Sequence, residues 1–160
     1  MSLEIRRALP SDRPWVLEFL QARWGSERQV VRGRMYFPAD FPGFIALIEG
    51  KPTGLVTFEI AGTECEVVFI DSGTQFAGIG SALLEAVKRA AREGSCTRLW
   101  LITTNDNLDA LRFYQRRGFV LAALYPDALK DSRRLKPGIP FIGDYGIPLR
   151  DELELEMALP

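Results

Sequence analysis

The sequence has no histidine, and this absence removes several kinds of active site. A Ser-His-Asp or Cys-His arrangement needs an imidazole as its base, so neither is available to this chain. The chain has two cysteines, Cys65 and Cys96, and no CxxC pair, so the usual zinc ligand sets are missing and no metal is expected. General base chemistry has to come from a carboxylate, a tyrosine, the α-amino group or water.

Other features are scarce as well. No apolar stretch approaches the length of a membrane span, and no basic segment followed by an apolar one indicates a signal peptide. The net charge of −1 argues against a nucleic-acid partner, which usually demands a basic patch. Two cysteines give no disulfide framework. We therefore expect a cytoplasmic protein with no membrane or nucleic-acid partner, in which both cysteines are buried.

The length and composition are those of an ordinary globular protein. A chain of 160 residues, 47% hydrophobic and 26% charged, can bury a sizeable core. No internal repeat, low-complexity segment or linker divides the sequence. Residues 1–160 are accordingly predicted to form a single domain.

An apolar segment, a glycine turn and an amphipathic helix follow one another in the middle of the chain. Val67-Val68-Phe69-Ile70 is typical of a buried strand, and the turn Gln75-Phe76-Ala77-Gly78-Ile79-Gly80 follows it. The helix is predicted from apolar residues at spacings of three and four, namely Ile79, Ala82, Leu83, Ala86, Val87 and Ala90. The first N–H groups of a helix have no partner within it, and its dipole is positive at that end. Such a turn is therefore either an anion site or only a tight connection.

Two well-known phosphate-binding motifs do not fit this turn. A dinucleotide fingerprint requires a glycine or another small residue where Leu83 stands. A P-loop requires a lysine where Ile79 stands, although Gly73 and Gly78 have the right separation. Without that lysine, the turn is suited to holding phosphates rather than to transferring one.

A second segment repeats the alternation of strand and helix. Residues 98–104 are predicted to form an apolar strand, and Asn105-Asp106-Asn107 ends it. A short helix over residues 108–117 follows, with Asn107 as its N-cap and Gly118 at its end. The segment contains the pattern N-x-x-A-x-x-x-Y-x-x-x-G-F, formed by Asn107, Ala110, Tyr114, Gly118 and Phe119.

Together the two segments resemble the GNAT superfamily of acetyl-CoA-dependent N-acetyltransferases. The family signature is Q/R-x-x-G-x-G/A at a strand–helix turn, followed one strand later by an Asn…Ala…Tyr helix and Gly-Phe. The resemblance covers residues 3–121. It implies an α/β (α+β) fold with a central mixed, twisted sheet of about six or seven strands and helices on both faces. Two parallel strands splay apart in that fold, and the acetyl-CoA cleft lies between them.

The resemblance also implies which residues hold the acetyl donor. Acetyl-CoA would place its pyrophosphate on the backbone amides of residues 76–81. The family's cofactor-binding positions at the turn correspond to Gln75, Phe76, Ala77, Gly78, Ile79, Gly80 and Ser81. The pantetheine arm would pair with the backbone of Ile70, Asp71 and Ser72. Asn107 and Ala110, on the second helix, are further contact positions, and capping of that helix is compatible with such a role for Asn107.

Catalytic roles follow from the same resemblance. Tyr114 is predicted to protonate the departing thiolate, for which a phenol is suited, although a core aromatic is the alternative. The general base is predicted to be Glu66 on the strand before the turn. Glu64 on the same strand, Glu59 on the preceding strand, water, or a purely solvent-facing role for these carboxylates remain open.

The flanking regions are predicted from local patterns. A first helix has the apolar face Trp15, Val16, Phe19 and Leu20, and residues 23–40 are expected to be loop with a short helix. Residues 44–48 and 54–60 form two strands joined by the turn at Glu49-Gly50. The segment 125–150, with four prolines, is expected to be an ordered loop over the acceptor site, and residues 151–157 alternate as a final strand.

Three functions are consistent with these patterns. The first is an N-acetyltransferase acting on a primary amine of a small molecule by direct attack in a ternary complex. The second is a protein or peptide N-acetyltransferase. The third is a non-catalytic acyl-CoA sensor. Tyr114 and the glutamates favour catalysis, and the long C-terminal segment favours a small-molecule amine acceptor. A homodimer is possible because the family often forms one, and the acceptor itself is not identified by the sequence.

Overall fold

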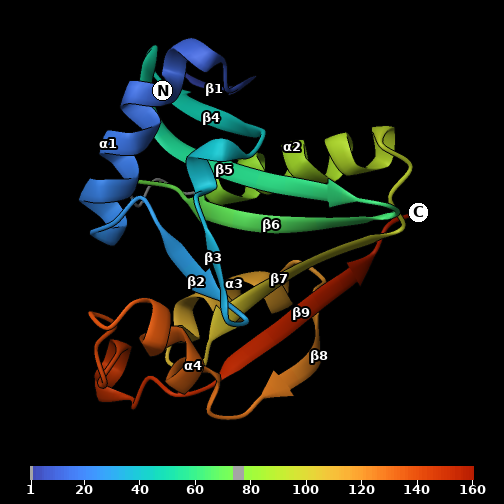
Figure 1. Ribbon diagram of the computed structural model, residues 1–160. Helices are drawn as coiled ribbons and strands as arrows, with labels where there is room; N and C mark the ends of the chain where they lie inside the picture. The colour runs from blue at the N-terminus through green and yellow to red at the C-terminus, as the bar shows by residue number, and fades with distance from the viewer. Residues whose placement is uncertain (1, 74–77) are drawn as a thin grey trace. The chain divides into compact units, whose positions relative to one another are not determined.

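The computed structural model describes residues 2–73 and 78–160 (Figure 1). The chain forms two compact units. The first unit comprises Met1–Arg28, Phe37–Leu99 and Leu159–Pro160, and the second comprises Gln29–Tyr36 and Trp100–Ala158.

The first unit is built on four neighbouring antiparallel strands. Their order is β1-β4-β5-β6, with bounds Leu3–Arg7, Gly43–Ile48, Lys51–Ala61 and Glu64–Asp71. The predicted turn joins β4 to β5, because Glu49 and Gly50 both take the positive φ angles (51° and 77°) that a tight hairpin needs. The strands at 44–48 and 54–60 are therefore confirmed.

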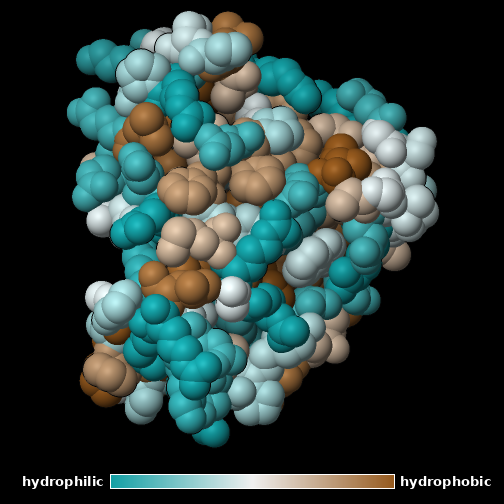
Figure 2. Space-filling model, in the orientation of Figure 1, coloured by the Kyte–Doolittle hydropathy of each residue, from teal (hydrophilic) through white to brown (hydrophobic). Residues whose placement is uncertain are grey.

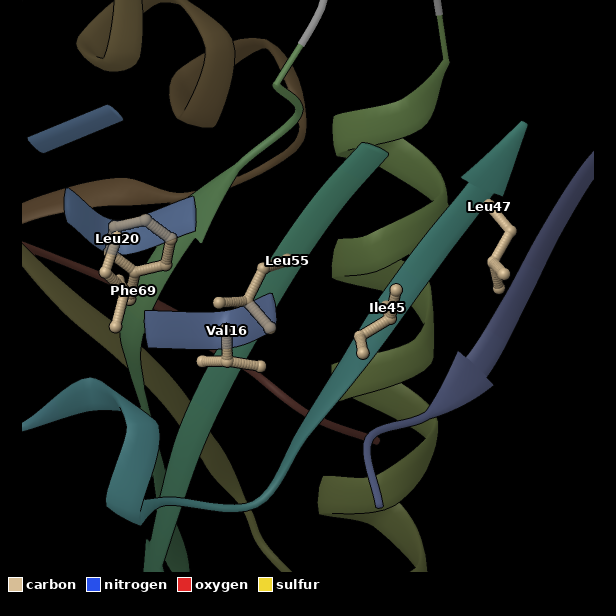
Figure 3. Packing of buried hydrophobic residues seen from close by; sticks show 6 residues of the cluster. All are labelled: Val16, Leu20, Ile45, Leu47, Leu55 and Phe69. Carbon is tan, nitrogen blue, oxygen red and sulfur yellow. The ribbon is translucent and has the colours of Figure 1, made fainter. Parts of the chain in front are cut away.

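Two helices cover the two faces of this sheet. The predicted first helix is α1 (Arg13–Trp24), and the helix after the glycine turn is α2 (Ile79–Glu93). Figure 3 shows α1 in front of the strands, with α2 behind them. Side chains from α1 and the three strands β4, β5 and β6 form the core between them, namely Val16, Leu20, Ile45, Leu47, Leu55 and Phe69.

The second unit contains the remaining strands and helices. Strand β7 (Arg98–Thr104) starts in the first unit and continues into the second, where β9 (Glu152–Ala158) neighbours it and β8 (Val120–Tyr125) pairs with β9. Two helices, α3 (Leu108–Arg116) and α4 (Ala128–Leu135), belong to this unit. A small hairpin of β2 (Gln29–Val31) and β3 (Arg34–Tyr36) completes it.

The structure differs from the sequence-based prediction in two segments. Residues 23–40, expected to be loop with a short helix, contain the β2–β3 hairpin and a 3₁₀ turn at Pro38–Asp40. Strands of three residues are too short to show a periodicity. The segment 125–150, expected to be loop, contains α4, in which four of eight residues are charged and which buries only Leu129 and Ser132.

The surface is mixed in character. On the face drawn in Figure 2, polar residues surround smaller groups of apolar ones. Within the described part of the chain, no helix combines the length and apolar character that crossing a membrane requires.

Candidate active site

The exit of β6 is held by one carboxylate. The side chain of Asp71 accepts hydrogen bonds from the backbone N–H of Gly73 (2.7 Å), from Arg23 Nε (3.1 Å) and from Trp24 Nε1 (3.1 Å). Both side-chain donors lie on α1. The chain is therefore fixed as it leaves the strand, at the residues that immediately precede the glycine turn.

Close backbone packing supports the same exit. Strand β5 carries an extra residue, Thr53, opposite a regular β4, and this bulge brings the Thr53 carbonyl against Gly73. A Cβ atom on Gly73 would collide with that oxygen, and the φ angle of Gly73 is +73°. Only glycine satisfies both conditions. Gly54 on β5 packs closely as well, since a Cβ atom there would lie 3.1 Å from the carbonyl oxygens of both Asp71 and Ser72.

The start of α2 has the features of an anion site. Gly78 is the N-cap, with φ +97°, and the first helical hydrogen bond runs from the N–H of Ala82 to the carbonyl of Gly78. The helix therefore provides no carbonyl for the N–H groups of Ile79, Gly80 and Ser81. The first turn contains no acidic residue, and no described residue other than the chain neighbours of Gly78 comes within 4 Å of the position that its Cβ would occupy. This end of the helix is suited to a phosphate or another anion.

Three carboxylates differ in their surroundings. Glu66 on β6 is 8% exposed. Glu59 on β5 is half-buried and lies directly opposite Glu66, so the two side chains share a face of the sheet. Glu64 is exposed and forms an ion pair with Arg98 (2.9 Å). Of the two carboxylates on β6, Glu66 is therefore the buried one, and Glu64 is held by an ion pair at the surface.

A β-bulge follows Glu66, and the sequence gives no sign of it. Thr57 pairs with Phe69 and Phe58 pairs with Val67, so Val68 is an additional residue in β6. A bulge leaves one residue outside the regular ladder and bends the strand. No glycine or proline marks this position, and only the register of the paired strands reveals it.

The second unit holds Tyr114 in an aromatic cluster. Tyr114 lies on α3, is 6% exposed, and packs edge-on against Phe113 (5.3 Å between ring centroids) and Phe119 (5.4 Å). Burial raises the pKa of the phenol above its ordinary value of 10.0. The group therefore stays protonated over the whole working pH range and has a proton to donate.

Asn107 is the N-cap of α3, as predicted. Its side-chain oxygen accepts a hydrogen bond from the N–H of Ala110 (3.3 Å), and its side-chain nitrogen donates to Thr103 Oγ1 (3.1 Å). An amide has two N–H donors and two lone pairs, so capping leaves one of each for a ligand.

Two residues that the sequence analysis treats only as strand breakers organise the C-terminal segment. The carboxylate of Asp106, which is buried, accepts from Thr104 Oγ1 (2.5 Å) and from the N–H of Asp144 (2.8 Å). Asn105 Oδ1 accepts from the N–H groups of Arg150 and Asp151. These bonds order the chain after α4. The signal that predicts them is the placement of short polar side chains at the end of a strand.

Arg133 also has a structural role in this segment. Its guanidinium donates to the carbonyls of Ile139, Pro140 and Leu149 and lies over the ring of Phe141. Its sequence context indicates either attraction of an acidic ligand or a solvated face, and neither interpretation includes these contacts. Phe141 and Tyr145 are exposed, so hydrogen bonds, rather than buried aromatics, order the segment.

Both cysteines are free and buried, as predicted. Burial raises the pKa of the Cys65 thiol to about 12, and burial also raises the pKa of Cys96. Neither thiol is a nucleophile at neutral pH. Among the described residues, no cluster of three carboxylate or thiol groups is arranged to hold a metal ion.

Residues 10–119 match the Acetyltransferase (GNAT) family, and this is more than half of the chain. The chain belongs to the GNAT family.

Two uncharacterized proteins and several solved acetyltransferases resemble it along most of their length. Two proteins of Bacillus subtilis (strain 168), the uncharacterized proteins YdhI and YxbD, are each 40% identical to it, over 137 and 145 residues. The matches cover 85% and 90% of this chain and 86% and 91% of the relatives. A Bacillus subtilis acetyltransferase solved in complex with CoA has a TM-score of 0.71 at 18% identity, covering 99% of this chain and 100% of that one. Nourseothricin acetyltransferase has a TM-score of 0.69 at 24% identity, with full coverage of both chains. The predicted α/β GNAT fold is confirmed.

The GNAT signature residues fall into two groups in the structure. Ile70, Asp71, Ser72, Gly78, Ile79, Gly80 and Ser81 lie at the β6 exit and the α2 start of the first unit, with Glu66 on β6. Asn107, Ala110 and Tyr114 lie on or beside α3 in the second unit. Gln75, Phe76 and Ala77 lie outside the described residues.

Proposed function

We propose that this GNAT protein transfers an acetyl group from acetyl-CoA to the primary amine of a small molecule, in a ternary complex of enzyme, donor and acceptor. The observation that carries the proposal is the start of α2. There a left-handed glycine N-cap and a first helical turn without an acidic residue coincide with the family's donor-binding signature.

The donor half of the proposal rests on backbone groups. Acetyl-CoA supplies an activated acetyl thioester, and its pyrophosphate would be held by the N–H groups at the start of α2, from Gly78 to Ser81. The half-buried end of β6, residues Ile70, Asp71 and Ser72, would pair with the pantetheine amides as an added strand does. The fixed Asp71 side chain keeps this edge in place without the donor.

The acid would be Tyr114. When the amine nitrogen attacks the acetyl carbonyl, the C–N bond forms and the C–S bond breaks, and the thiolate takes a proton from the phenol. The raised pKa of Tyr114 keeps that proton in place until it is needed.

The base would be Glu66, directly or through water. An alkylammonium must lose a proton before its lone pair can attack, and Glu66 is the most buried of the three candidate carboxylates. Glu59, opposite it, is the reserve. Glu64 is the weakest candidate because it is exposed and paired with Arg98.

The two alternatives differ in what they predict. A protein or peptide N-acetyltransferase would acetylate a free peptide N-terminus better than any small amine. A non-catalytic acyl-CoA sensor would bind acetyl-CoA but acetylate nothing. An amine panel and a peptide panel, assayed with the same enzyme preparation, distinguish the three.

Donor binding is tested by thermal shift. Acetyl-CoA and CoA, each at about a hundred times its dissociation constant, should stabilise the fold by about 2.7 kcal/mol, equivalent to roughly 5–10 °C in Tm for a chain of this size. NAD, which also carries a pyrophosphate, should give no comparable shift. A chain that shifts with neither acetyl-CoA nor CoA has no donor site, and the transferase proposal then loses its support.

The base is tested with Glu66→Gln. The variant should lower kcat/KM by about ten- to a hundredfold and remove the acidic limb of the pH–rate profile, because glutamine cannot accept a proton. Glu64→Gln is the matched control, since it changes an exposed carboxylate on the same strand and face. A profile for Glu66→Gln that matches the wild type would assign the base to another carboxylate or to water.

A further inference from the structure

A cavity of about 410 Å³ lies in the first unit, beneath the N-terminal end of α1. Its walls come from the chain before and at the start of α1, from the segment that precedes β4, and from β5. Apolar side chains dominate the lining, among them Leu9, Val16, Phe41 and Leu55. Figure 3 shows Val16 of α1 beside Leu55 of β5 in the core, and both residues line the cavity. The volume is in the range of small-ligand pockets.

The floor of the cavity contains a buried polar atom without a partner. Thr57 on β5 lines the cavity and is 2% exposed. Among the buried side-chain polar atoms of the described residues, its Oγ1 is the one that makes no hydrogen bond. A buried hydroxyl without a partner destabilises a fold, so its presence needs an explanation. A polar atom of a ligand in the cavity supplies one.

The charges at the mouth of the cavity neutralise each other. Arg13 and Asp40 both line it and form an ion pair at 2.8 Å, with side chains that are 51% and 56% exposed. Arg13 also donates to the carbonyl of Ala39 (3.1 Å). No other charged side chain of the described residues contributes to the lining. The interior therefore suits an uncharged, mainly apolar body, and a polycation would find no carboxylate inside.

The cavity opens on the same face of the sheet as the candidate base. Thr57 and Glu59 are two residues apart on β5, and Glu59 lies directly opposite Glu66. Diagonal neighbours on two strands are roughly 7–8 Å apart. The candidate base therefore lies on the strand next to the one that carries Thr57, on the same face of the sheet.

We propose that this cavity is the acceptor pocket, and that it takes the uncharged apolar or aromatic body of a primary monoamine. In this proposal the Thr57 hydroxyl bonds a polar atom of that body, such as a phenolic hydroxyl. The inference rests on the proposed transferase function, because it needs an amine acceptor, but it is tested separately by binding.

The test is calorimetric titration of the full chain with tyramine, phenethylamine and spermidine. Tyramine and phenethylamine should bind, and spermidine should bind at least tenfold more weakly. Ala39→Leu adds bulk to the cavity wall and should weaken tyramine binding tenfold or more, a loss of about 1.4 kcal/mol. Ala22→Leu, on an exposed position of α1, is the matched control and should leave binding unchanged. If Ala39→Leu does not fold, Leu9→Trp narrows the mouth from an exposed position.

Thr57→Val tests the hydroxyl itself. Valine has the same shape without the polar atom, so the variant should keep or raise the Tm. It should weaken tyramine binding severalfold and leave phenethylamine, which lacks the phenolic hydroxyl, unaffected.

The outcomes separate the two proposals. Equal tyramine affinity in wild type and Ala39→Leu, or preference for spermidine, would overturn the acceptor pocket. Tyramine binding that depends on the cavity, without any acetylation of it in the presence of acetyl-CoA, would support the pocket and contradict the transferase.

Discussion

Tyr114→Phe is expected to lower kcat by a factor of roughly ten or more, because it removes the proton donor for the departing thiolate. The fold should not change. The phenylalanine ring keeps the edge-on contacts with Phe113 and Phe119. Steady-state kinetics and a Tm measurement on the same preparation check both statements.

The pH dependence gives a second readout for Tyr114. Because its pKa is raised above 10.0, the hydroxyl stays protonated as the pH rises, and it should contribute no alkaline loss of kcat below about pH 10. Tyr145→Phe is the control, since Tyr145 is exposed and its hydroxyl bonds Asp109 (2.6 Å). Full turnover in Tyr114→Phe would remove this residue from the mechanism.

Gly73→Ala is expected to destabilise the protein by about 3–5 kcal/mol, at the upper end of single-residue effects. Alanine at a φ of +73° is strained, and its Cβ would collide with the Thr53 carbonyl on β5, which belongs to backbone that cannot rotate away. Relief of the clash requires the β6 exit to move, so acetyl-CoA binding should weaken as well. Urea unfolding and donor titration measure the two effects.

Gly62→Ala is the matched control, because it introduces the backbone strain of a positive φ without a steric collision. Gly62 has a similar φ of +61°, but among the described residues, its chain neighbours aside, none comes within 4 Å of the position of its Cβ. The free energy of unfolding of this variant should therefore fall by only about 1–2 kcal/mol, from the strain of alanine at a positive φ alone. The variant should bind acetyl-CoA as the wild type does. Equal losses of unfolding free energy in Gly73→Ala and Gly62→Ala would mean that the backbone at Thr53 moves at little cost and that packing does not fix the β6 exit.

Local signals predict the elements that carry the GNAT signature. Helix α2 shows six apolar residues at helical spacing, and the structure starts it at Ile79, directly after the glycine turn. Asn107 caps α3 because its short side chain places an oxygen where it accepts a hydrogen bond from the N–H of Ala110 in the first turn. The β2–β3 hairpin and α4 are not predicted, since strands of three residues and a helix of eight residues, half of them charged, are too short to show a clear pattern.

The residues of the candidate site also fall into those that the sequence identifies and those that only the structure reveals. Gly78 and Tyr114 can be found from the sequence because the family pattern fixes residue type and spacing at those positions. The bulge at Val68, the buried Asp106 and the unpaired Thr57 depend on which strands lie opposite each other, and a sequence without that register contains no sign of them. Glu66 is preferred over Glu64 because it is buried and Glu64 is exposed. The two residues are two apart on one strand and face the same way, so the sequence pattern alone does not show which of them is buried.

The burial of Cys65 and Cys96 has a practical consequence for the assay. Each turnover of the proposed reaction releases CoA with a free thiol. A chromogenic disulfide reagent that reacts with thiols therefore measures CoA release continuously. With the pKa of Cys65 raised to about 12 and both side chains inaccessible, the native enzyme adds almost no background colour. Slow appearance of two further thiol equivalents per chain would instead report unfolding, so one trace can follow catalysis and loss of structure together.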